Sequence, residues 1–96
     1  MQPAKPIIFT THALQRMQER GTREEDVREA IRIGRRELAQ RGLFLYRLNL
    51  EFKREWDSRY YAVQQVAPIV AEEEHRFVVI TVYTFCFREM SDEDYL

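Results

Sequence analysis

Cysteine is almost absent from this sequence, since Cys86 is the only one in 96 residues. A single cysteine excludes an internal disulfide and is typical of a reducing compartment, so we expect a cytoplasmic protein. No pair of histidines or cysteines has metal-ligand spacing, and the three glycines form no nucleotide-binding pattern. We therefore expect neither a metal nor another cofactor. No apolar run approaches the roughly 20 residues that a membrane span requires, and no membrane partner is expected.

An excess of charge is also missing, because the net charge is −1, but the charges are unevenly distributed. Residues 1–54 hold 12 Lys and Arg against 7 Asp and Glu, whereas residues 55–96 hold 3 against 9. The basic residues of the first part are mostly arginines, which bind phosphate through paired hydrogen bonds. They predict either a local anion-binding surface or two solvated helices on which arginines pair with glutamates.

The order of the patterns predicts one α+β domain over residues 1–96, with an ordered core at about 7–88 and loose tails. Helical periodicity covers residues 11–20, after a cap at Thr10 or Thr11 and before Gly21. A second helix runs from a capping box that begins at Thr22 to a stop at Gly34. The short apolar run at residues 7–9 is either an edge strand or a hydrophobic staple for the first helix.

After Gly34 the period of the pattern changes from helical to alternating. Strands are predicted at residues 43–53, 60–66 and 77–87, with a further short strand left open at 37–39. Short connections favour antiparallel neighbours, and Pro68 favours an edge or an end of its strand. We therefore predict two N-terminal helices packed on a three- to four-stranded antiparallel sheet, with residues 77–87 as the central strand.

One edge of the first helix has a possible chemistry. His12, Arg16 and Arg20 follow one another at four-residue spacing, so their side chains line a single stripe. The hydroxyls of Thr81 and Tyr83 share one face of the last strand. The ribose 2′-OH is itself the nucleophile in RNA cleavage. A histidine as acid/base, arginines as cations and a tyrosine are therefore enough for cleavage without a metal. The alternatives are that His12 only solvates a helix start, and that Thr81 and Tyr83 are ordinary strand formers.

The motif H-A-L-x-R-M-x-E-R-G at residues 12–21, a following T-x-E-E-x-V, and I-T-V-Y at residues 80–83 resemble a family of small bacterial and phage-borne proteins. That family is catalogued as a domain of unknown function. It is similar to RelE-like toxins and to the wider barnase, EndoU and colicin-type ribonuclease fold. The resemblance implies metal-independent RNA cleavage, a RelE/barnase-like fold, and a cognate antitoxin protein as partner.

Two hypotheses follow. In the first, the protein is a toxin-type endoribonuclease with RNA as substrate. The catalytic group is then His12, Arg16, Thr81 and Tyr83, and the phosphate-binding group is Arg20, Arg35, Arg36 and Arg47. In the second, the protein is an interaction module that kept the fold without nuclease activity, and His12 is structural. Both hypotheses leave a homodimer open.

Overall fold

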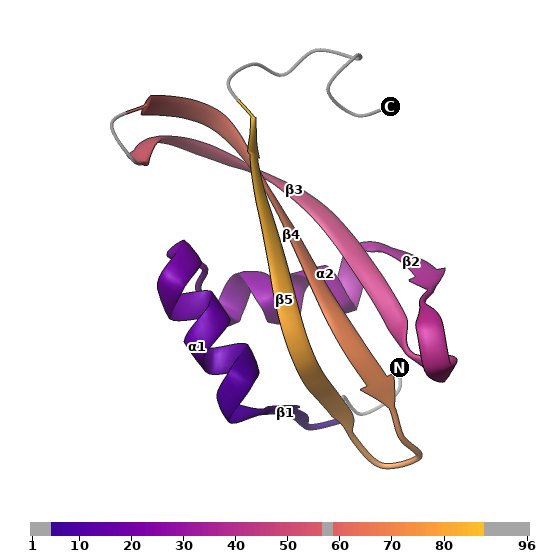
Figure 1. Cartoon of the computed structure of the whole chain (residues 1–96). Coiled ribbons are helices and arrows are strands. Elements are labelled where there is room, and N and C mark those ends of the chain that lie inside the picture. Colours follow the sequence, from indigo (N-terminus) through magenta and orange to yellow (C-terminus); the bar gives the residue numbers. More distant parts are fainter. Residues whose placement is uncertain (1–4, 57–58, 88–96) are drawn as a thin grey trace.

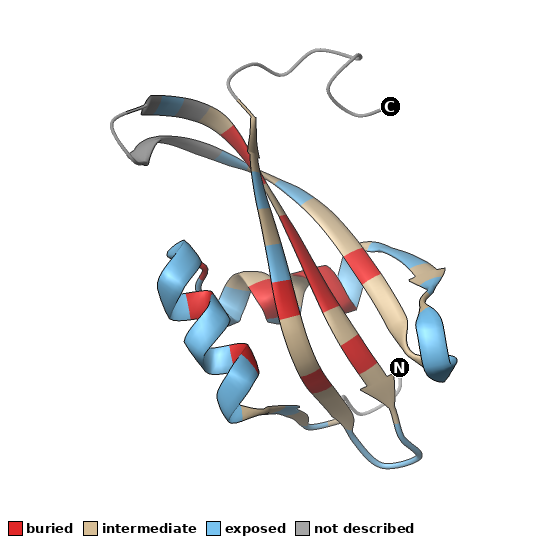
Figure 2. Cartoon of the chain, in the orientation of Figure 1, coloured by how far each residue is buried: buried red, intermediate tan, exposed pale blue. Residues whose placement is uncertain are grey.

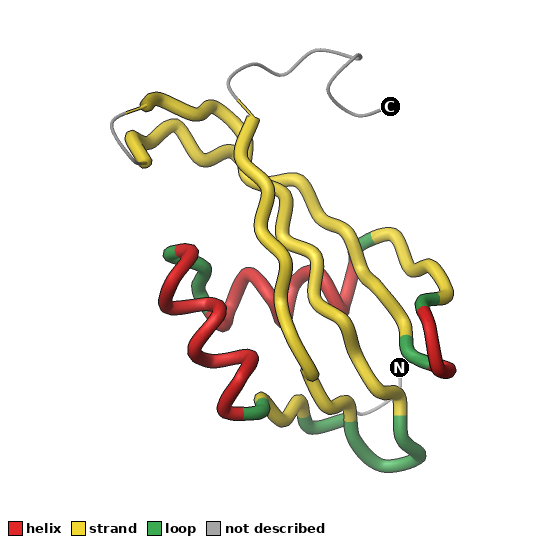
Figure 3. Tube along the Cα trace, in the orientation of Figure 1, coloured by secondary structure: helices red, strands yellow, loops and turns green. Residues whose placement is uncertain are grey.

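The computed structural model describes residues 5–56 and 59–87, in which two helices precede most of one sheet (Figure 1). In chain order the elements are β1 (Ile7–Phe9), α1 (Thr11–Arg20), α2 (Glu24–Ile33), β2 (Arg35–Leu38), the 3-10 turn η1 (Gln40–Gly42), β3 (Phe44–Trp56), β4 (Arg59–Glu72) and β5 (Phe77–Phe87). The predicted α+β class is confirmed, and both helices lie where helical periodicity placed them (Figure 3). No helix in the described part of the chain is long and apolar enough to cross a membrane.

The sheet differs from the predicted one in size and direction. Its five strands lie in the order β1-β5-β4-β3-β2, and β1 runs parallel to β5 while the other pairs are antiparallel. The prediction of three or four antiparallel strands was therefore wrong. β1 is only three residues long, too short for periodicity to separate a strand from a staple. The short strand left open at 37–39 is β2, which begins two residues earlier.

Proline did not end the fourth strand as expected. β4 continues to Glu72, and Pro68 lies inside it, fully buried and opposite Val82 of β5. The pairing of β4 with β5 shifts register between Ile69 and Val70, one residue beyond this proline. Such irregularities are where a residue without an N–H is tolerated within a sheet.

Both helices pack on the same face of the sheet, and the core lies between the helices and the sheet (Figure 2). The helices contribute their apolar stripes and the strands one alternating face; the buried cluster is Ala13, Met17, Val27, Ala30, Ile31, Tyr46, Val66, Val70, Val79 and Val82. The opposite sheet face, which we call the open face, is covered by neither helix. Close packing explains Gly34, because a Cβ there would lie 2.7 Å from the Arg47 carbonyl oxygen.

The helix ends confirm one predicted cap and correct another. The Thr10 hydroxyl accepts a 3.0 Å hydrogen bond from the amide of Ala13, and Gly21 ends α1 in the left-handed conformation (φ 67°). Thr22, however, does not cap α2: the N-cap is Arg23, without a side-chain bond. The Thr22 side chain is buried instead, and its hydroxyl shares a hydrogen bond with the hydroxyl of Thr84 on β5.

Candidate active-site groove between α1 and β5

The exposed stripe of α1 lies along the free edge of β5. Within the described residues, β5 pairs with β1 only at residues 77–79, and beyond them with β4 alone. α1 lies beside this unpaired stretch and leaves a groove of about 310 Å³. One wall is formed by the stripe His12, Arg16 and Arg20, and the other by residues 81–85. The groove therefore brings together residues that are about 65 positions apart in the sequence.

His12 contacts the opposite wall directly. Its Nε2 lies 3.1 Å from the Thr81 Oγ1, and the two groups share a hydrogen bond in which either atom can donate. This contact orients the imidazole across the groove. A histidine held in this way has its second ring nitrogen for proton transfer with a ligand.

Threonines fix both ends of the groove. At its start the Thr10 hydroxyl donates to the Ile80 carbonyl (3.0 Å), and the Thr10 amide donates to the Val79 carbonyl (3.2 Å). At its end the hydroxyls of Thr22 and Thr84 share a 2.7 Å hydrogen bond. Since α1 lies between these anchors, the helix is held to β5 at both ends. The spacing of the two walls is thus set by tertiary hydrogen bonds.

The groove is cationic. Two arginines and a histidine line it, and no carboxylate among residues 5–56 and 59–87 does. Arg16 makes a loose ion pair with Glu19 on its own helix, at 3.5 Å and with both side chains about half exposed. Burial raises the pKa of the Cys86 thiol, and the positive charge of Arg20 partly opposes this rise. A site of this charge favours an anionic ligand such as a phosphate.

Two aromatic side chains complete the rim. Tyr83 and Phe85 line the groove and are 52% and 43% exposed. Their rings are nearly parallel, with centroids 6.5 Å apart. Large exposed rings beside a cationic groove can stack on a planar group of a ligand.

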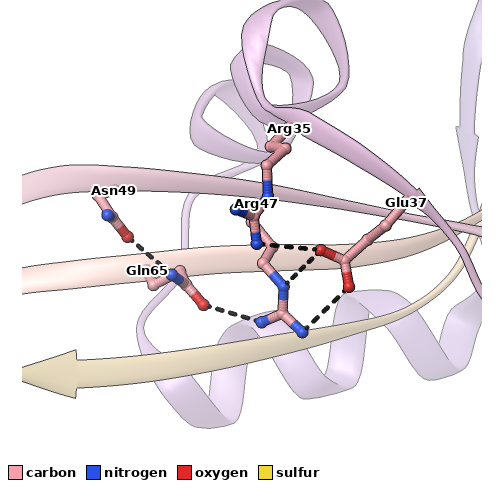
Figure 4. Close-up of polar contacts among 5 residues, drawn as sticks. All are labelled: Arg35, Glu37, Arg47, Asn49 and Gln65. Atoms are coloured by element: carbon pink, nitrogen blue, oxygen red, sulfur yellow. Dashed lines mark hydrogen bonds and ion pairs between the residues drawn. The ribbon is translucent and has the colours of Figure 1, made fainter. Parts of the chain in front are cut away.

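The structure does not bring the other predicted phosphate-binding residues to this groove. Arg35, Arg36 and Arg47 belong to β2 and β3, at the opposite edge of the sheet. Each is paired with a carboxylate there. Arg47 donates through Nε to Glu37 (3.1 Å), and the weaker ion pair of Arg35 with the same carboxylate is 3.4 Å (Figure 4). Arg47 holds the pKa of Glu37 below its ordinary value.

Arg36 belongs to a separate network on the helix side of the sheet. It donates two hydrogen bonds to Glu72, of 2.9 and 2.7 Å, and its guanidinium lies 3.7 Å from the centre of the Phe44 ring. The Tyr46 hydroxyl donates to the same carboxylate. Arg36 lowers the pKa of Glu72, and burial raises the pKa of Tyr46 to about 12. These contacts tie β2 to β4 across β3, which is a structural role.

Sequence reasoning missed several residues of the groove. Thr84 lines the groove and Thr22 bonds to it, yet neither was assigned to the site, and Thr22 was interpreted as the start signal of the second helix. Alternation along the last strand puts Phe85 on the same face as Thr81 and Tyr83, and that signal could have assigned it to the site.

One family model covers the α1 wall of this groove and the β5 wall as far as Thr84. A family model described as Domain of unknown function (DUF4258) matches residues 9–84. The chain belongs to this family. A search of the curated proteins gave no match, and a search of the solved structures gave none.

Proposed function

We propose that this DUF4258 domain is a small toxin-type endoribonuclease that cleaves RNA without a metal, as part of a toxin–antitoxin, phage or mobile-element system. It would act in the cytoplasm, be restrained by a cognate antitoxin protein, and share the RelE/barnase-like arrangement of a helix on an antiparallel sheet. One observation carries the proposal: His12 contacts Thr81 in a groove that also holds Arg16, Arg20 and Tyr83, and that no carboxylate of the described residues lines.

The groups present match the needs of the reaction. A general base takes the proton of the ribose 2′-OH, the 2′ oxygen attacks the adjacent phosphorus, and the 5′ oxygen leaves with a proton from an acid. The products are a 2′,3′-cyclic phosphate and a 5′-hydroxyl. His12 is the acid/base group in this scheme, and Thr81 holds its ring. Arg16 and Arg20 stabilise the negative charge that develops on the phosphate oxygens, and Tyr83 positions the substrate.

The test is cleavage of a labelled single-stranded RNA by the purified full chain in the presence of a chelator, with the cyclic phosphate detected by mass spectrometry. We expect His12→Ala to lower the rate at least about 100-fold, since general acid/base groups contribute roughly that much. His75→Ala is the matched control, because His75 lies in the β4–β5 loop with 88% of its side chain exposed. Its rate should equal that of the wild type.

The alternative, an interaction module without activity, makes the opposite prediction. If the wild-type chain leaves the RNA intact, or if His12→Ala cleaves as fast as His75→Ala, the nuclease proposal is wrong. Growth arrest on expression that His12→Ala relieves would support the toxin role.

A further inference from the structure

A line of side chains crosses the open face of the sheet, starting at the groove. Tyr83 and Phe85 border both the groove and this face, because they alternate with Val82 and Thr84 along β5. Their rings offer two nearly parallel planes at the point where a ligand would leave the groove. Stacking on such rings is available to any flat base and does not depend on sequence.

Strand register continues the line inward. Phe85 of β5 is paired with Gln65 of β4, and Gln65 is paired with Asn49 of β3. The two amides are joined by a hydrogen bond of 2.9 Å from the Gln65 Nε2 to the Asn49 Oδ1. Arg47 donates to the Gln65 Oε1 at 3.1 Å, which sets the direction of the whole chain of amides (Figure 4). The exposed Asn49 amide group therefore ends the chain in a fixed orientation.

These amides border a second hollow. It has a volume of about 250 Å³ and is lined by Arg35, Arg47, Asn49 and Gln65. Arg47 is held by Glu37 and Gln65, whereas Arg35 makes a weaker 3.4 Å pair with Glu37 and 78% of its side chain is exposed. Oriented amides recognise the edges of bases, and an exposed arginine contacts phosphate. The hollow thus combines both kinds of contact that a nucleotide needs.

We propose that this open face binds the nucleotides next to the one cleaved, so that the substrate is an unpaired strand of RNA. The strand leaves the groove over Tyr83 and Phe85 and continues to the amide hollow. In a duplex the bases are stacked on each other and their pairing edges are occupied, so neither the rings nor the amides could reach them. The proposal rests on the proposed function only in taking the groove as the place of the scissile phosphate.

The experiment measures binding rather than cleavage. The full chain carrying His12→Ala is titrated into a fluorescent 12-nucleotide RNA with 2′-O-methyl groups, and anisotropy gives the Kd. We expect Phe85→Leu to weaken binding about tenfold, because stacking on a lost ring is worth a factor of that order. Asn49→Asp should weaken it at least about fivefold, since a carboxylate replaces the donor amide. The same sequence as a duplex should bind at least about tenfold more weakly.

Two controls separate the possible failures. Arg32→Gln removes an exposed arginine of α2 that pairs only with Glu29 among the described residues, and should leave the Kd unchanged. A dinucleotide with its one phosphate in the groove extends by about one nucleoside to either side and does not reach β3, which lies two strands of about 4.8 Å each away, so its binding should be insensitive to Asn49→Asp. Circular dichroism confirms that each variant is folded.

The outcomes for binding and cleavage are independent. If the RNA is cleaved with dependence on His12, but Phe85→Leu and Asn49→Asp leave the Kd of the long strand unchanged, the open-face site is wrong and the nuclease stands. If the strand is bound with the expected dependence and never cleaved, the open-face site stands and the nuclease fails. Binding equal for the strand and the duplex, or no binding, overturns the open-face site.

Discussion

Arginines occur in two regions of this molecule, and their surroundings make them chemically different. In the groove, Arg16 and Arg20 line a site without a carboxylate from the part of the chain that the structure describes, and there Arg16 makes a loose pair with Glu19. At the β2 edge, Arg36 is held by Glu72, and Arg47 by Glu37. The comparison teaches that an arginine is more available for phosphate where the fold has not placed an acid firmly against it.

The strongest test of this comparison removes the groove cations. We expect Arg16→Gln with Arg20→Gln to lower RNA cleavage at least about 100-fold, as the loss of groups that stabilise developing charge commonly does. Because both side chains are exposed on α1, the free energy of unfolding should change by no more than about 0.5 kcal/mol. Initial rates and urea unfolding measure the two effects.

Arg36→Gln is the matched variant from the other region. Its cleavage rate should equal that of the wild type, while its stability falls. If Arg36→Gln lowered cleavage as much as the double change at Arg16 and Arg20, the groove arginines would not differ in function from those at the β2 edge.

The second test concerns stability at the β2 edge. We expect Glu72→Gln to lower the free energy of unfolding by about 1–2 kcal/mol, because Arg36 and the buried Tyr46 lose a shared charged acceptor. The Glu72 side chain is only 18% exposed, although its partner Arg36 is half exposed and therefore partly screened. Urea unfolding at pH 7 measures the loss, and cleavage should be unaffected.

The pH dependence of the same variant provides its control. Arg36 lowers the pKa of Glu72 in the folded state, and Arg47 does the same for Glu37. Their contribution to stability is therefore complete above the ordinary pKa of 4.5 and is lost as the pH falls through the lower folded values. The decline of stability with acid should be shallower in Glu72→Gln. A curve parallel to that of the wild type would show that the pair contributes nothing.

The smallest expected effect comes from making the second region resemble the first. Glu37→Gln removes the carboxylate that Arg35 and Arg47 share, and leaves both guanidiniums free to attract phosphate. We expect a two- to fivefold lower Kd for the 12-nucleotide strand, and a salt dependence steeper by about one released counterion. Anisotropy titrations at several salt concentrations measure both.

Glu29→Gln is the control for this change, because it frees Arg32 on the helix side and should not alter the Kd. If Glu37→Gln weakens binding instead, the ion pair is needed to hold Arg47 against Gln65. Binding would then depend more on the fixed position of Arg47 than on a guanidinium that is free of its carboxylate.

Local pattern determined much of the candidate site. The 3.6-residue period placed His12, Arg16 and Arg20 on one stripe, and the two-residue alternation placed Thr81 and Tyr83 on one strand face. Thr10 and Gly21 marked the ends of α1 for the same reason, since caps depend on neighbouring residues. These features involve atoms only a few residues apart, which is why the sequence alone predicts them.

Other features depend on which distant segments meet. Whether the α1 stripe faces Thr81 was decided by the contact of Thr10 with Ile80 and of Thr22 with Thr84. The parallel pairing of β1 with β5, and the capture of Arg36 by Glu72, were likewise decided only in the folded chain. Residue type and spacing state what a side chain can do. Tertiary structure decided which arginines have an acid beside them and which are left for a ligand, because that outcome depends on contacts between segments dozens of residues apart.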